Sequence, residues 1–167
     1  MRCRSGRTRK EINMEKNYKM TIKDLEKLKG DSYSLMRYFA RHGMPVIRLK
    51  KGRNVAYAYM EKDAHGTDSD VLGAIASSGG GVGTDLFKEI LKEQAKQGRG
   101  LQWHADKDSA DSFYKKLGLG KYFDSTKTNN TFNHYKMSSQ DVKDYVTQME
   151  EPKKWVTING KHIPIFK

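Results

Sequence analysis

Apolar residues in this chain recur at two spacings, one typical of strands and the other typical of helices. The run Val71–Ala76 is short, apolar and bounded by turn residues, so it predicts a buried strand. The glycine-rich stretch Ser78–Thr84 follows it directly. Beyond this stretch the spacing is helical and stops at Gly98, which predicts a strand, a glycine loop and a helix in that order. The apolar helix positions are Leu86, Phe87, Ile90, Leu91 and Ala95.

The same patterns predict elements on both sides of this unit. Two β-rich runs about a turn predict a hairpin upstream, and an Asn-Gly pair between β-rich segments predicts another near the C-terminus. Capping residues and helical spacing predict two helices near the N-terminus and one after the last core strand. The predicted ranges are 21–28 and 32–41 (helices), 46–50 with 55–60 (hairpin), 101–105 (strand), 110–117 (helix), 133–137 (strand), 138–149 (helix) and 155–166 (hairpin).

The glycine loop has the composition of an anion-binding site. Glycine tolerates positive φ and the close approach of a ligand, and the unpaired N–H groups at the start of a helix attract negative charge. No Gly-Lys-Ser/Thr sequence follows, so the loop does not match a nucleotide-binding P-loop. A flexible turn is the alternative interpretation of the same residues.

Three stretches of the chain, in family order, resemble the GNAT superfamily of acetyl-CoA-dependent acyltransferases. Ser78–Gly83 is similar to the family motif Gln/Arg-x-x-Gly-x-Gly/Ala, which opens its main helix. Lys107–Leu119 resembles the family sequence Asn-x-x-Ala-x-x-Phe-Tyr-x-Lys-x-Gly-Phe. Asn133–Met137 resembles the closing strand of such domains, so the resemblance covers roughly residues 45–137.

The resemblance implies an α+β fold with a GNAT-like, mixed and mostly antiparallel central sheet. Helices would cover both faces, and one βαβ crossover would bind the cofactor. We therefore expect a basic, flexible arm over residues 1–20, an acetyltransferase domain over 21–137 with its core at 45–137, and a helix with a hairpin-like tail over 138–167. In the family, helices in the place of residues 21–41 cap the acceptor site; an unrelated N-terminal addition is the alternative.

The resemblance also implies a function, the transfer of an acetyl group from acetyl-CoA to an amine of a protein or a small molecule. The strand end would hold the pantetheine arm of the cofactor through its backbone, and the N–H groups of the loop would hold the pyrophosphate. Lys107, which replaces the Asn of the family pattern, is a candidate for binding a phosphate of the same cofactor, and an exposed side chain without this contact is the alternative. The other implied cofactor contacts are Ile75, Ala76, Ser77, Ser78, Gly79, Gly80, Gly81, Val82, Gly83 and Thr84.

Proton transfer needs an acid and a base. Tyr114 stands where the family often has a phenolic general acid, and packing beside Phe113 is its alternative role. Phenol and thiol have ordinary pKa values within about two units, so a proton can pass to a departing thiolate. His104 is a candidate base because the pKa of imidazole is about 6.5. Trp103 and His104 alternate along their strand, so we expect only one of them to face the cofactor. Comparable candidates for the base are Glu61, Asp68 and Asp70.

Departures from the family pattern leave a second function open. Ser78 replaces the long Gln or Arg of the first motif position, Lys107 replaces Asn, and Leu119 replaces Phe. A domain with such changes can keep its fold after losing activity, so a structural or morphogenesis protein of a bacteriophage is the alternative. Residues 155–167 resemble the ends of bacteriophage head and minor structural proteins, and they are candidates for docking a phage or host protein.

The net charge of +12 lies mainly near the N-terminus. Residues 1–44 contain 12 basic and 5 acidic side chains, and five of the basic ones fall within residues 2–10. Such an arm can contact nucleic acid, an acidic protein or a membrane surface, and a nucleic-acid-binding accessory protein is the third hypothesis. A solvated tail is the alternative, as is a start of translation at Met14 or Met20.

Composition argues against several other classes of protein. Cys3 is the single cysteine, and the five histidines show no paired ligand spacing, so the sequence predicts neither an internal disulfide nor a structural metal site. No apolar run approaches the roughly 20 residues of a membrane span, and the basic N-terminus has no apolar signal segment. We therefore expect a protein of the host cytoplasm, or one packaged in a virion, without a membrane partner.

Overall fold

The structure of this chain is a computed structural model, which describes residues 12–28, 33–62, 68–150 and 154–165. Its strands are β1 (Ile12–Lys19), β2 (Pro45–Lys51), β3 (Asn54–Glu61), β4 (Ser69–Ser77), β5 (Gly100–Asp106), β6 (Phe123–Asp124), β7 (Phe132–Met137), β8 (Lys154–Ile158) and β9 (Lys161–Ile165). Its helices are α1 (Tyr33–Arg41), α2 (Val82–Gln97), α3 (Asp111–Lys116) and α4 (Ser139–Glu150), with the 3-10 helices η1 (Ile22–Lys27) and η3 (Gly120–Tyr122).

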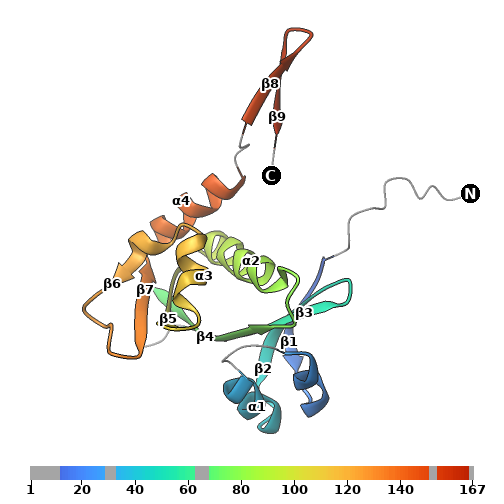
Figure 1. Ribbon diagram of the computed structural model, residues 1–167, viewed down its shortest axis with the longest axis vertical. Helices are drawn as coiled ribbons and strands as arrows, with labels where there is room; N and C mark the ends of the chain where they lie inside the picture. The colour runs from blue at the N-terminus through green and yellow to red at the C-terminus, as the bar shows by residue number, and fades with distance from the viewer. Residues whose placement is uncertain (1–11, 29–32, 63–67, 151–153, 166–167) are drawn as a thin grey trace, which may run out of the picture.

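One mixed sheet forms the centre of the molecule (Figure 1). Within the described residues it has seven strands in the order β1-β2-β3-β4-β5-β7-β6, and β8 and β9 form a separate hairpin. Strands β4 and β5 are parallel, and the other neighbours in this sheet are antiparallel. Parallel neighbours need a long crossover, which α2 provides. The predicted fold class is confirmed: a mixed, mostly antiparallel sheet with helices on both faces and one βαβ crossover.

Each face of the sheet carries its own hydrophobic core. The core under α2, α3 and α4 includes Ala56 and Ala58 of β3. The core under η1 and α1 includes Val55 and Tyr57 of the same strand. This separation follows from the alternation of side chains along a strand. In the part of the chain that the structure describes, no helix combines the length and hydrophobicity needed to cross a membrane.

The expected arm over residues 1–20 is wrong in its second half, and residues 1–11 lie outside the described ones. Ile12–Lys19 is strand β1, which pairs with β2, and Met20 is buried in the core under α1. β1 is at the edge of the sheet, where charged side chains such as those of Glu15 and Lys16 are common. These charges give an ordered strand the composition of a solvated tail.

The predicted C-terminal hairpin is confirmed. Asn159 and Gly160 connect β8 to β9 with φ values of 52° and 79°, as a tight two-residue hairpin turn requires. Figure 1 shows this hairpin projecting from the end of α4. Ile158 and Ile163 are exposed on it. Its role in docking another protein stays a prediction, and so does an origin in a bacteriophage.

Candidate active site

The parallel strands β4 and β5 pair only along their first halves. Ser69–Leu72 lies opposite Gly100–Trp103, and Leu72 with Trp103 is the last pair. Beyond this pair, β4 keeps its partner β3 as far as the pair of Ser77 with Ala56, and β5 keeps its partner β7. The sheet is therefore split between β4 and β5 at the end where the glycine loop begins.

A β-bulge at Gly73 starts this split. Tyr59 lies opposite Ala74 but Met60 lies opposite Leu72, so Gly73 is an extra residue of β4. A bulge bends the strand that carries it. A Cβ atom at position 73 would lie 3.1 Å from Cδ2 of Tyr59, so a larger residue would press on this ring. An isolated glycine in an apolar strand is a known signal for a bulge, and it could have located the split from the sequence.

The split opens into a cleft of about 870 Å³. Its walls come from the separated strands, the first turn of α2, α3, and the segment before β7, with one residue from α1. Sequence motifs did not indicate several lining residues, among them Leu35, Asp106, Asn129 and Phe132. The predicted site residues that line the cleft are Ile75, Ala76, Ser77, Gly83, His104 and Tyr114.

The cleft passes from one face of the sheet to the other. Trp103 belongs to the core under α2, and His104, the next residue of β5, faces the opposite side. Both nevertheless line the cleft, contrary to our expectation that only one would face it. The reason is that β4 and β5 are no longer paired beyond Leu72 and Trp103, so this edge of β5 is open to the cleft. Tyr114 of α3 lies on the first face, and Leu35 of α1 on the second.

Three consecutive glycines form the loop between β4 and α2. Gly79, Gly80 and Gly81 have φ values of 104°, 70° and 79°, a region that is costly for residues with a side chain. A Cβ atom on Gly80 would also collide with the side chain of Asn54. The sequence therefore permits a tight turn that larger residues would block.

The loop places the first turn of α2 at the end of the cleft, where Gly83 lines it. The N–H of Val82 donates to the carbonyl oxygen of Gly79, and the N–H of Asp85 donates to that of Gly81. Helix geometry gives the N–H groups of Gly83 and Thr84 no acceptor within the helix. Such groups can bind anions, and the anion site that the sequence predicts for this loop stays a prediction.

Three of the predicted cofactor contacts, Ser78, Val82 and Lys107, have other contacts in the structure. Ser78 anchors the loop to β3, because its Oγ accepts the N–H of Val55 at 3.0 Å and donates to Oδ1 of Asn54 at 3.1 Å. It does not line the cleft. The side chain of Val82 is buried in the core under α2. Lys107 has an exposed side chain outside the cleft, and its N–H donates to the carbonyl oxygen of Thr131.

Tyr114 packs in the core and also lines the cleft. Its ring centroid lies 5.3 Å from that of Trp103 and 5.4 Å from that of Phe87, so the ring is part of an aromatic cluster. The same residue lines the cleft. Burial raises the pKa of the Tyr114 phenol well above its ordinary value. The phenol is therefore protonated at neutral pH, and its pKa lies further from that of an ordinary thiol than we expected.

His104 lies at the opposite side of the cleft. Partial burial, with a smaller contribution from the positive charge of Lys127, lowers the pKa of His104 below the ordinary value for imidazole. Its ring is therefore neutral at neutral pH. A neutral imidazole can accept a proton, which is what a general base must do.

The three carboxylates proposed as alternative bases do not line the cleft. Asp70 is buried at the start of β4, where Oδ1 pairs with Arg99 at 2.9 Å and Oδ2 accepts a hydrogen bond from Gln94 at 2.9 Å. Glu61 and Asp68 are exposed, and they lie at the same end of the strands. This end is opposite to the glycine loop. Within the described ranges, no three His, Cys, Asp or Glu side chains group in a way that could hold a metal ion.

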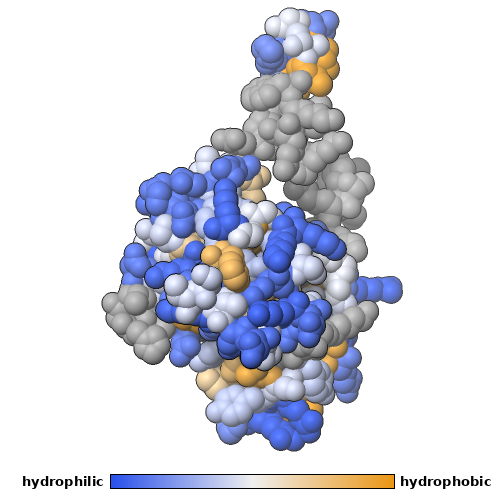
Figure 2. All heavy atoms as spheres, turned by 60° about the vertical axis from the view of Figure 1, so that its left-hand side comes forward, coloured by the Kyte–Doolittle hydropathy of each residue, from blue (hydrophilic) through white to orange (hydrophobic). Residues whose placement is uncertain are grey.

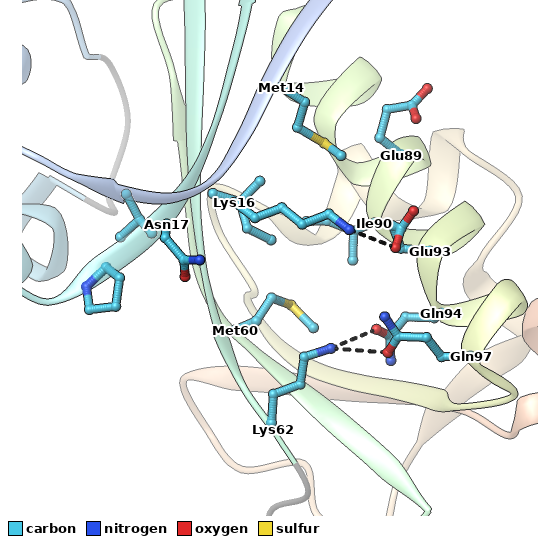
Figure 3. Close-up of a pocket in the computed structure, with 13 residues that line it drawn as sticks. Met14, Lys16, Asn17, Met60, Lys62, Glu89, Ile90, Glu93, Gln94 and Gln97 are labelled. Carbon is cyan, nitrogen blue, oxygen red and sulfur yellow. Dashed lines mark hydrogen bonds and ion pairs between the residues drawn. The ribbon is translucent and has the colours of Figure 1, made fainter.

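A second hollow, of about 320 Å³, lies between β1–β3 and the C-terminal half of α2 (Figure 3). Lys16 pairs with Glu93 across it at 2.9 Å. Lys62 donates to Oε1 of Gln97 at 3.3 Å, and Met60 points into the space between these two contacts (Figure 3). The polar side chains of this hollow thus connect α2 to the sheet. The candidate acid Tyr114 and the candidate base His104 line the cleft instead.

Comparison with known proteins gives matches to solved structures only. No protein-family profile matches the chain, and no curated protein does. One solved structure is described as a bacterial toxin; it has a TM-score of 0.55 and 13% identity, and the match covers 83% of this chain and 96% of that one. Another is a mutant of the AtaT toxin bound to acetyl-CoA and the C-terminus of the antitoxin AtaR, with a TM-score of 0.52, 18% identity and coverage of 83% and 99%. The chain therefore shares the fold of these toxins, which is the GNAT-type fold that its motifs predict.

Proposed function

We propose that this protein is an N-acetyltransferase that moves the acetyl group of acetyl-CoA to an amine. The observation that carries this proposal is the split of the sheet beyond Leu72 and Trp103. The edge of β4 that β5 leaves has backbone groups that can bind an extended, amide-containing chain as a neighbouring strand would. The pantetheine arm of coenzyme A is such a chain. The glycine loop at the end of the same strand suits its pyrophosphate.

Two further features fit this occupant. A Cβ atom on Gly83 would lie 3.2 Å from Oγ of Ser77, so the bare glycine backbone keeps the passage between strand and helix open. The buried indole N–H of Trp103 has no hydrogen-bond partner within the described residues, although Trp103 lines the cleft. Buried donors are nearly always satisfied, and a carbonyl group of a bound ligand would satisfy this one. The solved toxin with the same fold contains acetyl-CoA.

The positions of Tyr114 and His104 suit the two proton transfers. Acetyl-CoA supplies an activated acyl group on a thiol leaving group. Tyr114, kept protonated by burial, is the donor for the departing thiolate. The same buried surroundings raise the pKa of a thiol that lies beside Tyr114. The difference between the pKa of the phenol and that of the thiol is therefore smaller than it would be for an exposed thiol. His104, on the other face of the sheet, is the acceptor for the proton of the attacking amine.

The acceptor amine enters from the face of α1. Leu35 and Phe132 line this end of the cleft, and they are 48% and 39% exposed. On the surface shown in Figure 2, hydrophobic side chains gather low on the body, at the height of α1, while most of the surface is hydrophilic. Asp106 lies one step beyond His104 on the same face of β5 and also lines the cleft. This end therefore suits an amine attached to an apolar group, with a carboxylate that attracts its charge.

We also infer that the reaction inhibits the growth of the cell that makes the protein. Both solved neighbours are described as toxins, and one is bound to part of an antitoxin. Induced expression in a bacterial host would test this, with Gly83→Glu as the matched inactive variant. Growth arrest by the wild-type chain but not by the variant supports the inference. Equal growth of both cultures contradicts it.

Calorimetric titration with acetyl-CoA tests the proposed activity directly. Gly83→Glu places a carboxylate at the cleft, and position 83 has no positive φ that would strain the new side chain. We expect binding by the wild type and a loss of at least about tenfold in the variant, since one lost charge-assisted contact and an added repulsion exceed about 1.4 kcal/mol. Gly120→Glu is the control, because Gly120 also lacks a positive φ and lies outside the cleft. Absence of wild-type binding at millimolar acetyl-CoA would reject the proposal.

A further inference from the structure

The candidate base His104 has a second histidine beside it. His104 on β5 and His134 on β7 are direct partners across the two strands, and their ring centroids lie 4.7 Å apart. His104 is exposed at the cleft, whereas His134 is only 2% exposed. The proposed reaction does not use His134. A buried imidazole next to a reactive one nevertheless affects it, since two charges at this separation interact strongly in a partly buried site.

His134 is held between two oxygen atoms. Its Nε2 lies 3.2 Å from Oε1 of Gln102. Its Nδ1 has no hydrogen bond among the described residues, and it lies 3.5 Å from Oδ2 of Asp124 on β6. A neutral imidazole carries one N–H and can serve one of these oxygens, whereas the protonated ring serves both. The oxygens of Gln102 and Asp124 therefore favour an added proton on His134.

Other charged groups near the pair come from three segments. Burial contributes most to the lowered pKa of both histidines, and the positive charge of Lys127, in the connection between β6 and β7, lowers both further. The charge of His104 also lowers the pKa of His134, with a larger effect than that of Lys127. Asp124 acts in the opposite direction and on His134 alone. Asp106 and Lys136 lie one step along the same faces of β5 and β7. Of these groups, only Asp124 distinguishes the two rings in favour of His134.

We propose that Asp124 and Gln102 direct the first proton bound by this histidine pair to His134, so that His104 stays neutral and available to the acceptor amine. Two protonated rings at 4.7 Å repel each other, so the first proton delays the binding of a second. His134 and Asp124 are positioning residues in this arrangement, because they act through His104. The role of His104 as a base rests on the proposed function. The order in which the two histidines bind protons does not depend on that function.

A titration of the full-length, isotope-labelled protein by nuclear magnetic resonance resolves the rings individually. We expect His134 to bind its proton at a higher pH than His104. In His134→Gln the repulsion is lost, so the pKa of His104 should rise by about 0.5–1 unit. In Asp124→Asn the preference for His134 should weaken, and the two rings should titrate together. Asp144→Asn, an exposed carboxylate on α4, is the control and should change neither ring.

Two results would overturn the proposal. One is a wild-type protein in which His104 binds the first proton. The other is an Asp124→Asn protein in which the order and the two pKa values are those of the wild type. Asp124 is 23% exposed on its side chain, so this variant remains informative if the buried His134→Gln variant does not fold.

Activity measurements separate this proposal from the proposed function. For an active enzyme, His134→Gln should move the acidic limb of the pH profile of kcat/KM upward by the same 0.5–1 unit, about the shift expected for His104, with an unchanged KM for acetyl-CoA. An unmoved acidic limb would contradict the catalytic use of His104. An inactive protein would reject the proposed function, and the resonance titration would still decide where the proton lies.

Discussion

Leu72 of β4 and Trp103 of β5 form the last pair between the two parallel strands, and the cleft begins directly beyond them. Two residues before this pair, buried Asp70 is bound to Arg99 and Gln94. The strands are thus held together by ionic and polar contacts at one end and separated by a bulge at the other. The width of the cleft depends on both.

Replacement of Asp70 by Asn should lower stability without filling the cleft. The change removes charge-assisted hydrogen bonds to Arg99 and Lys62, and we expect a loss of about 1.5–3 kcal/mol in the free energy of unfolding. Urea denaturation monitored by circular dichroism would measure it. Asp68→Asn, at an exposed neighbouring position, is the control. Equal stability of both variants would show that the buried contacts contribute little.

Gly73→Val should damage the cleft more than the fold. The added side chain presses on the ring of Tyr59 and disfavours the bulge, so β4 should follow β5 further. We expect affinity for acetyl-CoA to fall at least about tenfold, since a closed split removes several backbone contacts each worth about 0.5–1.5 kcal/mol. Calorimetry with Gly120→Val as the control would measure this. Unchanged affinity would mean that the bulge does not set the opening.

Tyr114→Phe separates the chemical role of this residue from its role in packing. The ring contacts with Trp103 and Phe87 remain, so stability and acetyl-CoA affinity should change little. Turnover should fall by about 10²-fold if the hydroxyl donates a proton in the reaction. Tyr122→Phe, outside the cleft, is the control. Wild-type turnover in the Tyr114 variant would assign the residue to packing alone.

Asp111 should contribute stability that depends on pH. Burial raises its pKa, but hydrogen bonds from Lys115, Tyr135 and Asn133 outweigh this and hold the pKa below the ordinary value of 3.8. The contribution is therefore complete above pH 3.8 and is lost as the pH falls through the lower pKa of the folded state. Asp111→Asn should lose about 1–3 kcal/mol at neutral pH. Its stability should converge with that of the wild type in strong acid, as urea denaturation at several pH values would show.

Hydrophobic spacing predicted the elements that bury a regular apolar face. β4, α2 and β5 are examples, because each contributes such a face to the core under α2. β1 escaped prediction because an edge strand keeps charged residues, and its few apolar ones belong to different faces: Met14 packs against the core under α2, and Tyr18 against the core under α1. Local signals sufficed for the C-terminal hairpin, since its turn depends on Asn159 and Gly160 alone.

Only part of the candidate site could be found in the sequence. The motifs indicated Ile75–Ser77, Gly83 and Tyr114, which lie next to one another because one βαβ unit and the next helix carry them. Leu35 and Phe132 come from distant segments, and only tertiary packing brings them to the cleft. Local sequence also could not show that the carboxylate of Asp70 is used in ion pairs.

The opening of the cleft on both faces of the sheet has a consequence for kinetics. Acetyl-CoA that binds beside α2 and α3 does not cover the opening beside Leu35, through which the amine enters. Both reactants can therefore be bound at the same time. Double-reciprocal plots of initial rate at several fixed concentrations of the second reactant should therefore intersect. Parallel lines would instead indicate a covalent acetyl-enzyme, for which two separate entrances would bring no advantage.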